Sequence, residues 1–283
     1  MESNEVALVH ATDWIRPKSQ TIDQGRTENP QSSSLRPDGS VNISTFCVPC
    51  DSIHKSLSIM ECFRVLSFDK VNILLKDLMR IDGLDRVSGG TIIFSYRPED
   101  PSTPYVLLLK RSPQSTDDAG QLKANSFSGT WEGGGGGANL EDETIAKTAV
   151  RETAEETGLV PRAASSRVYC VRFTHKGHRM AKFTFITRAD ENVSCQRRWS
   201  DEHQEPRGPA GIRPSDEHLD CVWVTEEQIR NSVAYNPQDM EQRGLVILES
   251  IKMVYLDFFA WLKENDPDMK CPLPEYQLPS NRA

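Results

Sequence analysis

The distribution of apolar and polar positions divides the chain into a polar beginning and a longer patterned remainder. Residues 13–45 are rich in Ser, Pro, Gln, Asn and charged side chains, with too few apolar residues to bury in a core. Apolar density rises afterwards, and residues 71–81 carry apolar side chains at helical spacing. We therefore predict a disordered N-terminal arm over 1–45 and a helical N-terminal extension over 46–84.

Several segments rich in β-branched, aromatic or aliphatic residues predict strands: residues 91–96, 105–110, 167–174, 179–188 and 218–224. The run at 105–110 is continuously apolar up to Lys110, which is typical of a strand buried on both faces. Gly89 and Gly90 are expected to interrupt the chain before the first of these strands.

The last part of the chain predicts an amphipathic helix. Apolar residues between Leu245 and Leu262 repeat at intervals of three and four, which places them on one helix face. We expect this face to pack on the domain core, and a dimer interface is the alternative. Thr225 is expected to cap the start of a shorter helix. Residues 189–216 are charged and contain Pro and Gly, so they predict a long loop insertion.

Composition limits the partners that we expect. The chain has 283 residues, 33 Lys and Arg against 41 Asp and Glu, and a net charge of −8. This balance argues against proteins that coat nucleic acid or an anionic membrane surface. No membrane span or secretory signal is visible, and seven scattered cysteines favour reduced thiols. We therefore predict a cytoplasmic monomer or homodimer, with no nucleic acid and no membrane partner.

Three glutamates share one face of a helix predicted after a glycine-rich turn. At about 100° per residue, Glu152, Glu155 and Glu156 fall within an arc of roughly 100°. Like charges at this spacing repel, so they need a counter-charge nearby. Arg151 can balance one carboxylate, and a hard divalent cation, which prefers oxygen ligands, can balance the others. Residues 137–159 hold six acids and two bases, so half of the net charge lies here.

These residues complete a pattern that resembles the signature of Nudix hydrolases, G-x5-E-x7-R-E-U-x-E-E-x-G-U, in which U is bulky and apolar. The matching positions are Gly137, Glu143, Arg151, Glu152, Glu155, Glu156, Gly158 and Leu159. We call residues 137–159 the Nudix box. Thr153 stands at the first U position; it is close to Val in size, but its hydroxyl needs a partner. Upstream, Trp131-Glu132 leads into five glycines, where many family members carry an apolar residue and Pro.

The resemblance implies a Nudix-type α/β/α sandwich with a mixed sheet over 85–235, followed by a C-terminal helix and tail over 236–283. It also implies Mg²⁺-dependent hydrolysis of a diphosphate linkage, with Mn²⁺ as a substitute metal. The small-molecule substrate would be a nucleoside diphosphate derivative or another organic diphosphate. The alternative is a non-catalytic Nudix-fold module for ligand binding or regulation, which we expect to have lost carboxylates of the box.

The resemblance implies a metal site built from the box. Glu152, Glu155 and Glu156 would bind Mg²⁺ directly or through water. A backbone carbonyl of Gly136 or Gly137 would be a further ligand. Metal ions at such a site neutralise the diphosphate charge and acidify a bound water.

The resemblance also implies how the box is held together and where the proton goes. Arg151 would orient Glu155 and pair with Glu143. Glu217 is the first candidate for the base that takes the proton from the attacking water, and Glu152 is the second. Basic residues on predicted strands are candidates for holding phosphates; they are Lys110, Arg172, Arg179 and Lys182.

Overall fold

The computed structural model describes residues 59–97, 100–116, 121–139, 141–189, 212–236, 239 and 242–277. The predicted N-terminal arm over 1–45 and most of the insertion over 189–216 lie outside the described residues. Within the described ranges, none of the helices has the length and apolar character that crossing a membrane requires.

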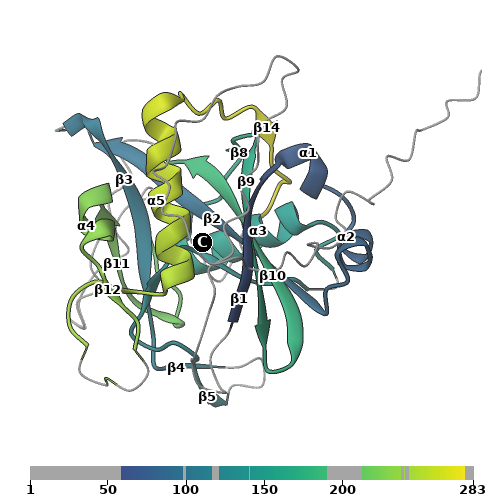
Figure 1. Ribbon diagram of the computed structural model, residues 1–283, viewed down its shortest axis with the longest axis horizontal. Coiled ribbons are helices and arrows are strands. Elements are labelled where there is room, and N and C mark those ends of the chain that lie inside the picture. The colour runs from purple at the N-terminus through teal and green to yellow at the C-terminus, as the bar shows by residue number, and fades with distance from the viewer. Residues whose placement is uncertain are drawn as a thin grey trace, which may run out of the picture. The chain divides into compact units, whose positions relative to one another are not determined.

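A mixed sheet runs through the described part of the chain, in the order β1-β9-β10-β2-β3-β6-β13-β12, with β11 paired to β3 and β7 paired to β2 (Figure 1). Its strands are β1 (Ile59–Ser67), β2 (Arg86–Arg97), β3 (Asp100–Arg111), β6 (Trp131–Glu132), β7 (Gly135–Gly137), β9 (Arg167–His175), β10 (His178–Arg188), β11 (His218–Val224), β12 (Val233–Ala234) and β13 (Val246–Ile247). The pair β10–β2 is parallel, whereas β9–β10 and β2–β3 are antiparallel. The predicted strands are therefore confirmed, and so is a mixed α/β fold.

Helices cover both faces of this sheet. The helices are α1 (Phe68–Val71), α2 (Leu75–Asp82), α3 (Ile145–Thr157), α4 (Glu226–Arg230) and α5 (Glu249–Glu264). On one face, α5 buries aromatic side chains such as Phe258 against the sheet (Figure 1). On the other face, α1, α2 and α3 share a second apolar core with β9 and β10. The α/β/α sandwich thus follows from which side of each strand is apolar.

Gly89 and Gly90 do not interrupt the chain, contrary to the sequence-based expectation, because β2 runs straight through them. A Cβ atom on Gly89 would lie 2.8 Å from the backbone of α3, at the carbonyl oxygen of Ile145. A Cβ atom on Gly90 would lie 2.5 Å from the carbonyl oxygen of Gly134. The glycines are needed here because α3, the helix of the Nudix box, and the five glycines at 133–137, which we name the glycine loop, approach the strand closely, and not because the strand ends.

Two elements near the ends of the domain differ from the sequence pattern. The prediction of a helical extension over 46–84 was wrong at residues 59–67, because β1 lies there and extends the sheet beyond 85–235 by antiparallel pairing with β9. Its alternation is short: Phe63 and Val65 pack towards the α5 side of the sheet and Leu66 towards the other. The C-terminal helix begins at Glu249, later than its apolar repeat, because Val246 and Ile247 pair as a strand with β12.

The chain beyond α5 returns to the domain. β14 (Cys271–Pro272) pairs antiparallel with β8 (Ala163–Ala164). β8 is the first strand after α3 along the chain. A separate hairpin joins β4 (Gln114–Thr116) to β5 (Leu122–Ala124). Cys271 is a free thiol, but Cys221 in β11 is disulfide-bonded, so the expectation of reduced thiols throughout was wrong at Cys221.

Candidate active site

The site is built on α3, whose start and end are specified locally. The Thr144 side chain caps the helix by accepting a hydrogen bond from the Lys147 backbone N–H at 3.2 Å. Gly158 ends the helix with a left-handed φ of 75°. Small residues, Ala146 and Ala149 among them, are fully buried and let the helix lie close to β2. The glutamates of the last two turns therefore project beside the glycine loop.

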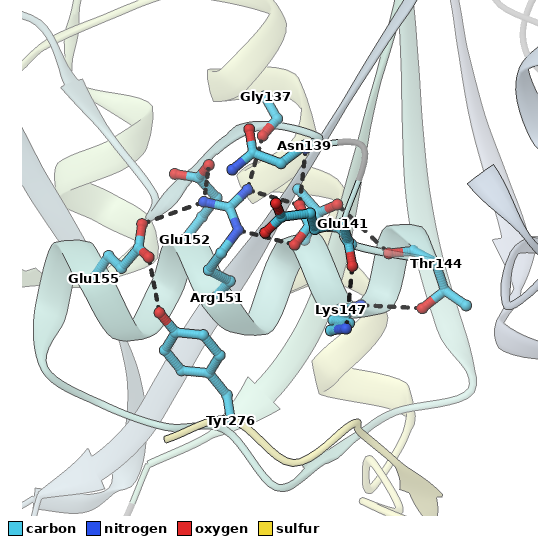
Figure 2. Close-up of polar contacts among 11 residues, drawn as sticks. Gly137, Asn139, Glu141, Thr144, Lys147, Arg151, Glu152, Glu155 and Tyr276 are labelled. Carbon is cyan, nitrogen blue, oxygen red and sulfur yellow. Dashed lines mark hydrogen bonds and ion pairs between the residues drawn. The ribbon is translucent and has the colours of Figure 1, made fainter. Parts of the chain in front are cut away.

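Arg151 holds the outer carboxylates of the box (Figure 2). Its Nε and Nη2 donate to both oxygens of Asp142, at 2.9 and 2.7 Å. Its Nη1 donates to Glu152 at 2.7 Å and to Glu155 at 3.2 Å. We name Arg151, Asp142, Glu152 and Glu155 the Arg151 cluster. The predicted orientation of Glu155 by Arg151 is present in these contacts.

The predicted pair between Arg151 and Glu143 is wrong, because Asp142 takes that place. Asp142 is buried and also accepts from the Asn139 backbone N–H at 2.9 Å. Glu143 has a positive φ of 25° and an exposed side chain. Its backbone carbonyl accepts from the Leu75 N–H at 2.8 Å, which ties the box to α2. The loop therefore turns Asp142, and not Glu143, towards the guanidinium.

Glu155 has a second partner from a distant part of the chain. The Tyr276 hydroxyl donates to Glu155 Oε1 at 2.8 Å, across 121 positions of sequence. Figure 2 shows Tyr276 and Arg151 at different oxygens of the Glu155 carboxylate. Nothing in the sequence pattern pointed to Tyr276, because its position follows from the return of the C-terminal tail to the domain.

The inner end of the site is a second set of charged groups, Glu132, Glu156, His218 and Arg111, which we name the buried cluster. Arg111 in β3 forms an ion pair with Glu132 in β6. The His218 Nε2 atom lies 3.9 Å from Glu132 and 3.9 Å from Glu156, beyond hydrogen-bond distance. His218 is 1% exposed, and its Nδ1 lies 3.3 Å from the Ser215 hydroxyl. Sequence analysis noted Trp131-Glu132 only as a departure from the family pattern.

The charges of the site shift the pKa values of its carboxyl groups. Burial raises the pKa of Glu156 well above its usual value, and the nearby charges of Glu132 and Glu152 raise it further. Burial also raises the pKa of Glu152 to about 7, and Arg151 offsets only part of that effect. Burial acts in the same direction on Glu132, but His218 and Arg111 outweigh it and lower its pKa to about 2.

The glycine loop touches both glutamates that carry raised pKa values. The Gly135 N–H donates to Glu156 Oε2 at 2.5 Å. A Cβ atom on Gly136 would lie 2.3 Å from Glu152 Oε2, so the carboxylate rests on the bare Cα. The carbonyl of Gly137 accepts from Arg151 Nη2 at 3.0 Å. The glycines thus allow the backbone to approach the carboxylates closely.

Glu217 and Lys182 lie near these carboxylates. The negative charge of Glu217 contributes to the raised pKa values of Glu152 and Arg111. The positive charge of Lys182, in β10, acts on Glu132 and lowers its pKa. Sequence analysis had singled out both residues, Glu217 as a base and Lys182 as a phosphate contact, and the fold brings both to the box.

The other basic candidates are engaged elsewhere. Arg172 forms an ion pair with Asp82 in α2 at 2.5 Å. The Arg179 backbone N–H donates to Asp85 at 2.7 Å, and its side chain is largely exposed. The Lys110 ammonium lies 5.9 Å from the ring centre of Trp131. None of these contacts is made to a carboxylate of the box.

Thr153 has the hydroxyl partner that its position requires. Its side chain shares a buried hydrogen bond of 2.8 Å with the Thr91 hydroxyl of β2. Because both groups are buried, the pair satisfies two polar atoms that would otherwise lack water. The departure from a bulky apolar residue is therefore compensated by β2.

The carboxylates do not converge as a ready metal site in the described conformation. No group of three or more His, Cys, Asp or Glu side chains in the described ranges is arranged to hold a metal ion. In this conformation Glu155 accepts hydrogen bonds from Arg151 and Tyr276, and Glu156 accepts one from the Gly135 N–H. Two surface cavities, of about 660 and 390 Å³, are lined partly by α4 and contain none of the three box glutamates.

Comparison with known proteins agrees with this geometry. The family model described as NUDIX domain matches residues 90–246, which is more than half of the chain. The chain belongs to the Nudix family. None of the curated proteins compared with it matches.

Several solved structures are similar to this chain. A Caenorhabditis elegans Ap4A hydrolase in a binary complex is 13% identical, with a TM-score of 0.40; the match covers 64% of this chain and 99% of that one. A MutT NUDIX hydrolase from Burkholderia pseudomallei is 19% identical, with a TM-score of 0.36; the match covers 61% of this chain and 95% of that one. A mutT/nudix family protein from Listeria innocua is 19% identical, with a TM-score of 0.40; the match covers 64% of this chain and 96% of that one.

Proposed function

We propose that this Nudix protein is a Mg²⁺-dependent hydrolase that cleaves a diphosphate linkage in a nucleoside diphosphate derivative or another organic diphosphate. The observation that carries the proposal is the placement of two α3 carboxylates against the glycine loop: Glu156 accepts from the Gly135 N–H, and Glu152 lies against Gly136. Burial there raises the pKa of both carboxyl groups. Arg151 offsets only part of this effect at Glu152, and a divalent cation beside the two carboxylates would supply further positive charge. Family membership supports the same reaction class.

The donor atoms of the box suit a hard cation by their chemistry. Glu152, Glu155 and Glu156 offer carboxylate oxygens, and no thiol or imidazole competes within the box. The Gly136 carbonyl is the favoured further ligand, because Gly136 lies against Glu152 while the Gly137 carbonyl already accepts from Arg151. When bound, the cation would neutralise phosphate charge and lower the pKa of a coordinated water.

Residues of the chain supply the remaining roles. Glu217 is the proposed base that takes the proton from the attacking water, and Glu152 is the alternative. Lys182 is the proposed phosphate contact, because its charge lies near Glu132 and Glu156. Arg151 keeps Glu152 and Glu155 in place by direct hydrogen bonds.

The test is hydrolysis of a diphosphate panel by the full chain, with product identification. The panel holds a nucleoside triphosphate, a dinucleoside polyphosphate, a nucleotide sugar and a diphosphate without a nucleoside, each with Mg²⁺, with Mn²⁺ and with a chelator. We expect the protein to cleave at least one of these compounds, and to do so only when the metal is present. Glu156→Gln should lower its kcat by at least about 100-fold, because a neutral amide cannot replace the charged ligand.

Glu143→Gln is the matched control, since Glu143 is an exposed box glutamate outside the Arg151 cluster. It should retain most of the activity. If wild type and Glu156→Gln cleave every compound equally slowly, the enzyme proposal fails. A Nudix-fold module for binding or regulation would then be the better description.

A further inference from the structure

The C-terminal tail is anchored beside the box. Cys271 and Pro272 pair with Ala164 and Ala163, and the Leu273 N–H donates to the Arg162 carbonyl at 3.0 Å. Leu273 is buried in the apolar core that α2 and α3 share. These contacts set where the next residues of the tail can lie.

Tyr276 extends from this anchor to the box. Its ring packs against the same apolar core, and its hydroxyl donates to Glu155 Oε1 at 2.8 Å. Arg151 donates to the other oxygen, Oε2, at 3.2 Å. Two donors from different parts of the chain thus hold the two oxygens of one carboxylate (Figure 2).

We propose that Tyr276 is a positioning residue for Glu155, so that the C-terminal tail completes the cation site of the box. The inference rests on the proposed function, because it takes Glu155 as a metal ligand. The Glu155 side chain is 31% exposed and, without fixed partners, would sample several rotamers. A carboxylate has about four lone-pair sites, so an oxygen that accepts from Tyr276 can still bind a cation. Hydrogen bonds from such outer partners commonly change metal affinity by about 10–100-fold.

The test is direct Mn²⁺ binding by the full chain, measured by electron paramagnetic resonance, beside the Mg²⁺ dependence of turnover. Tyr276→Phe keeps the ring and removes only the hydroxyl. We expect it to raise the Mn²⁺ dissociation constant by about tenfold. Tyr105→Phe is the matched control, because the Tyr105 hydroxyl donates to Asp100 at 3.2 Å, away from the box, and it should leave Mn²⁺ binding unchanged.

A double-mutant cycle separates positioning from tail packing. If Tyr276 acts through Glu155, then Tyr276→Phe should have no further effect on Mn²⁺ binding in a Glu155→Gln background. An equal loss in both backgrounds would assign Tyr276 to packing alone and overturn the inference. An unchanged or tighter Mn²⁺ dissociation constant in Tyr276→Phe would also overturn it.

These outcomes are distinct from failure of the proposed function. If wild type binds Mn²⁺ but cleaves no diphosphate, the proposed reaction fails while the Mn²⁺ measurements still decide the role of Tyr276. If wild type cleaves a diphosphate but the cycle shows no coupling, the reaction stands and the Tyr276 inference fails. Absence of Mn²⁺ binding by wild type would overturn the inference, because Glu155 would then have no cation to bind.

Discussion

The two ends of the carboxylate set on α3 are stabilised in different ways. In the Arg151 cluster, one guanidinium donates to Asp142, Glu152 and Glu155 and to a loop carbonyl. In the buried cluster, the Arg111 Nε and His218 Nε2 atoms are buried without a hydrogen-bond partner among the described residues. The guanidinium of the first cluster is fully engaged in hydrogen bonds, whereas the second cluster contains two buried nitrogen atoms without a partner among the described residues.

This difference indicates that the Arg151 cluster holds the loop, whereas the buried cluster keeps two nitrogen atoms unpaired within the described part of the chain. A buried polar group without a partner costs about 1–3 kcal/mol, so it persists where another molecule or the function requires it. Glu156, which carries the strongly raised pKa, belongs to the incomplete cluster. Glu152 ion-pairs with Arg151 and also raises the pKa of Glu156, so it links the two.

Removal of Arg151 should have the largest effect on stability. Arg151→Met would leave the buried Asp142 carboxylate and two glutamates without their counter-charge. Breaking a buried pair from one side costs about 3–5 kcal/mol, which urea unfolding of the metal-free protein would measure. Arg111→Met should cost less, about 2 kcal/mol, because it removes one ion pair and His218 remains beside Glu132. Equal losses in the two variants would contradict the comparison.

The raised pKa of Glu152 predicts a pH-dependent stability in the absence of metal. Because the folded-state pKa is about 7 and the usual value is 4.5, the folded protein holds a proton that the unfolded chain releases. The stability from this group is fully present below pH 4.5 and is lost as the pH rises through 7. Wild type should therefore lose about 3 kcal/mol relative to Glu152→Gln between pH 4.5 and 8.

Urea unfolding of both proteins in chelator, at several pH values, would measure this difference. The comparison between the two proteins removes the contribution of groups that titrate equally in both. Addition of Mg²⁺ at pH 8 should restore wild type but not Glu152→Gln, since a bound cation stabilises the charged form. A difference between the proteins that does not vary with pH would refute the assignment.

A methyl group at Gly136 should displace the Glu152 carboxylate, which links the two clusters, with the smallest effect on the stability of the fold. Gly136→Ala places a Cβ atom 2.3 Å from Glu152 Oε2, so the carboxylate must move while the backbone has room. We expect turnover to fall about tenfold, with a change in unfolding free energy below about 1 kcal/mol. Gly137→Ala is the control, because no atom lies within 4 Å of its added Cβ. Similar turnover in the two variants would show that Glu152 need not rest on Gly136.

The agreement between sequence and structure depends on the kind of feature. The strand β3 was predicted from a continuous apolar run and the helix α3 from its helical period, and both features are local. The interruption at Gly89 and Gly90 was wrong, because a glycine that admits a neighbouring helix has the same sequence signature as one that ends a strand. β1 was missed because its short alternation gains meaning only when it pairs with β9.

The sequence by itself determined the Nudix box: the helical period aligned three glutamates and an arginine, since spacing along one helix depends on neither the sheet nor the tail. Only the tertiary structure decided the partners of those carboxylates. Asp142 replaced Glu143 at Arg151 because of one loop residue with a positive φ. His218 and Glu132 reached Glu156 from separate strands, and Tyr276 reached Glu155 across 121 positions. Such contacts depend on how the sheet, the glycine loop and the tail pack together, which no local period records.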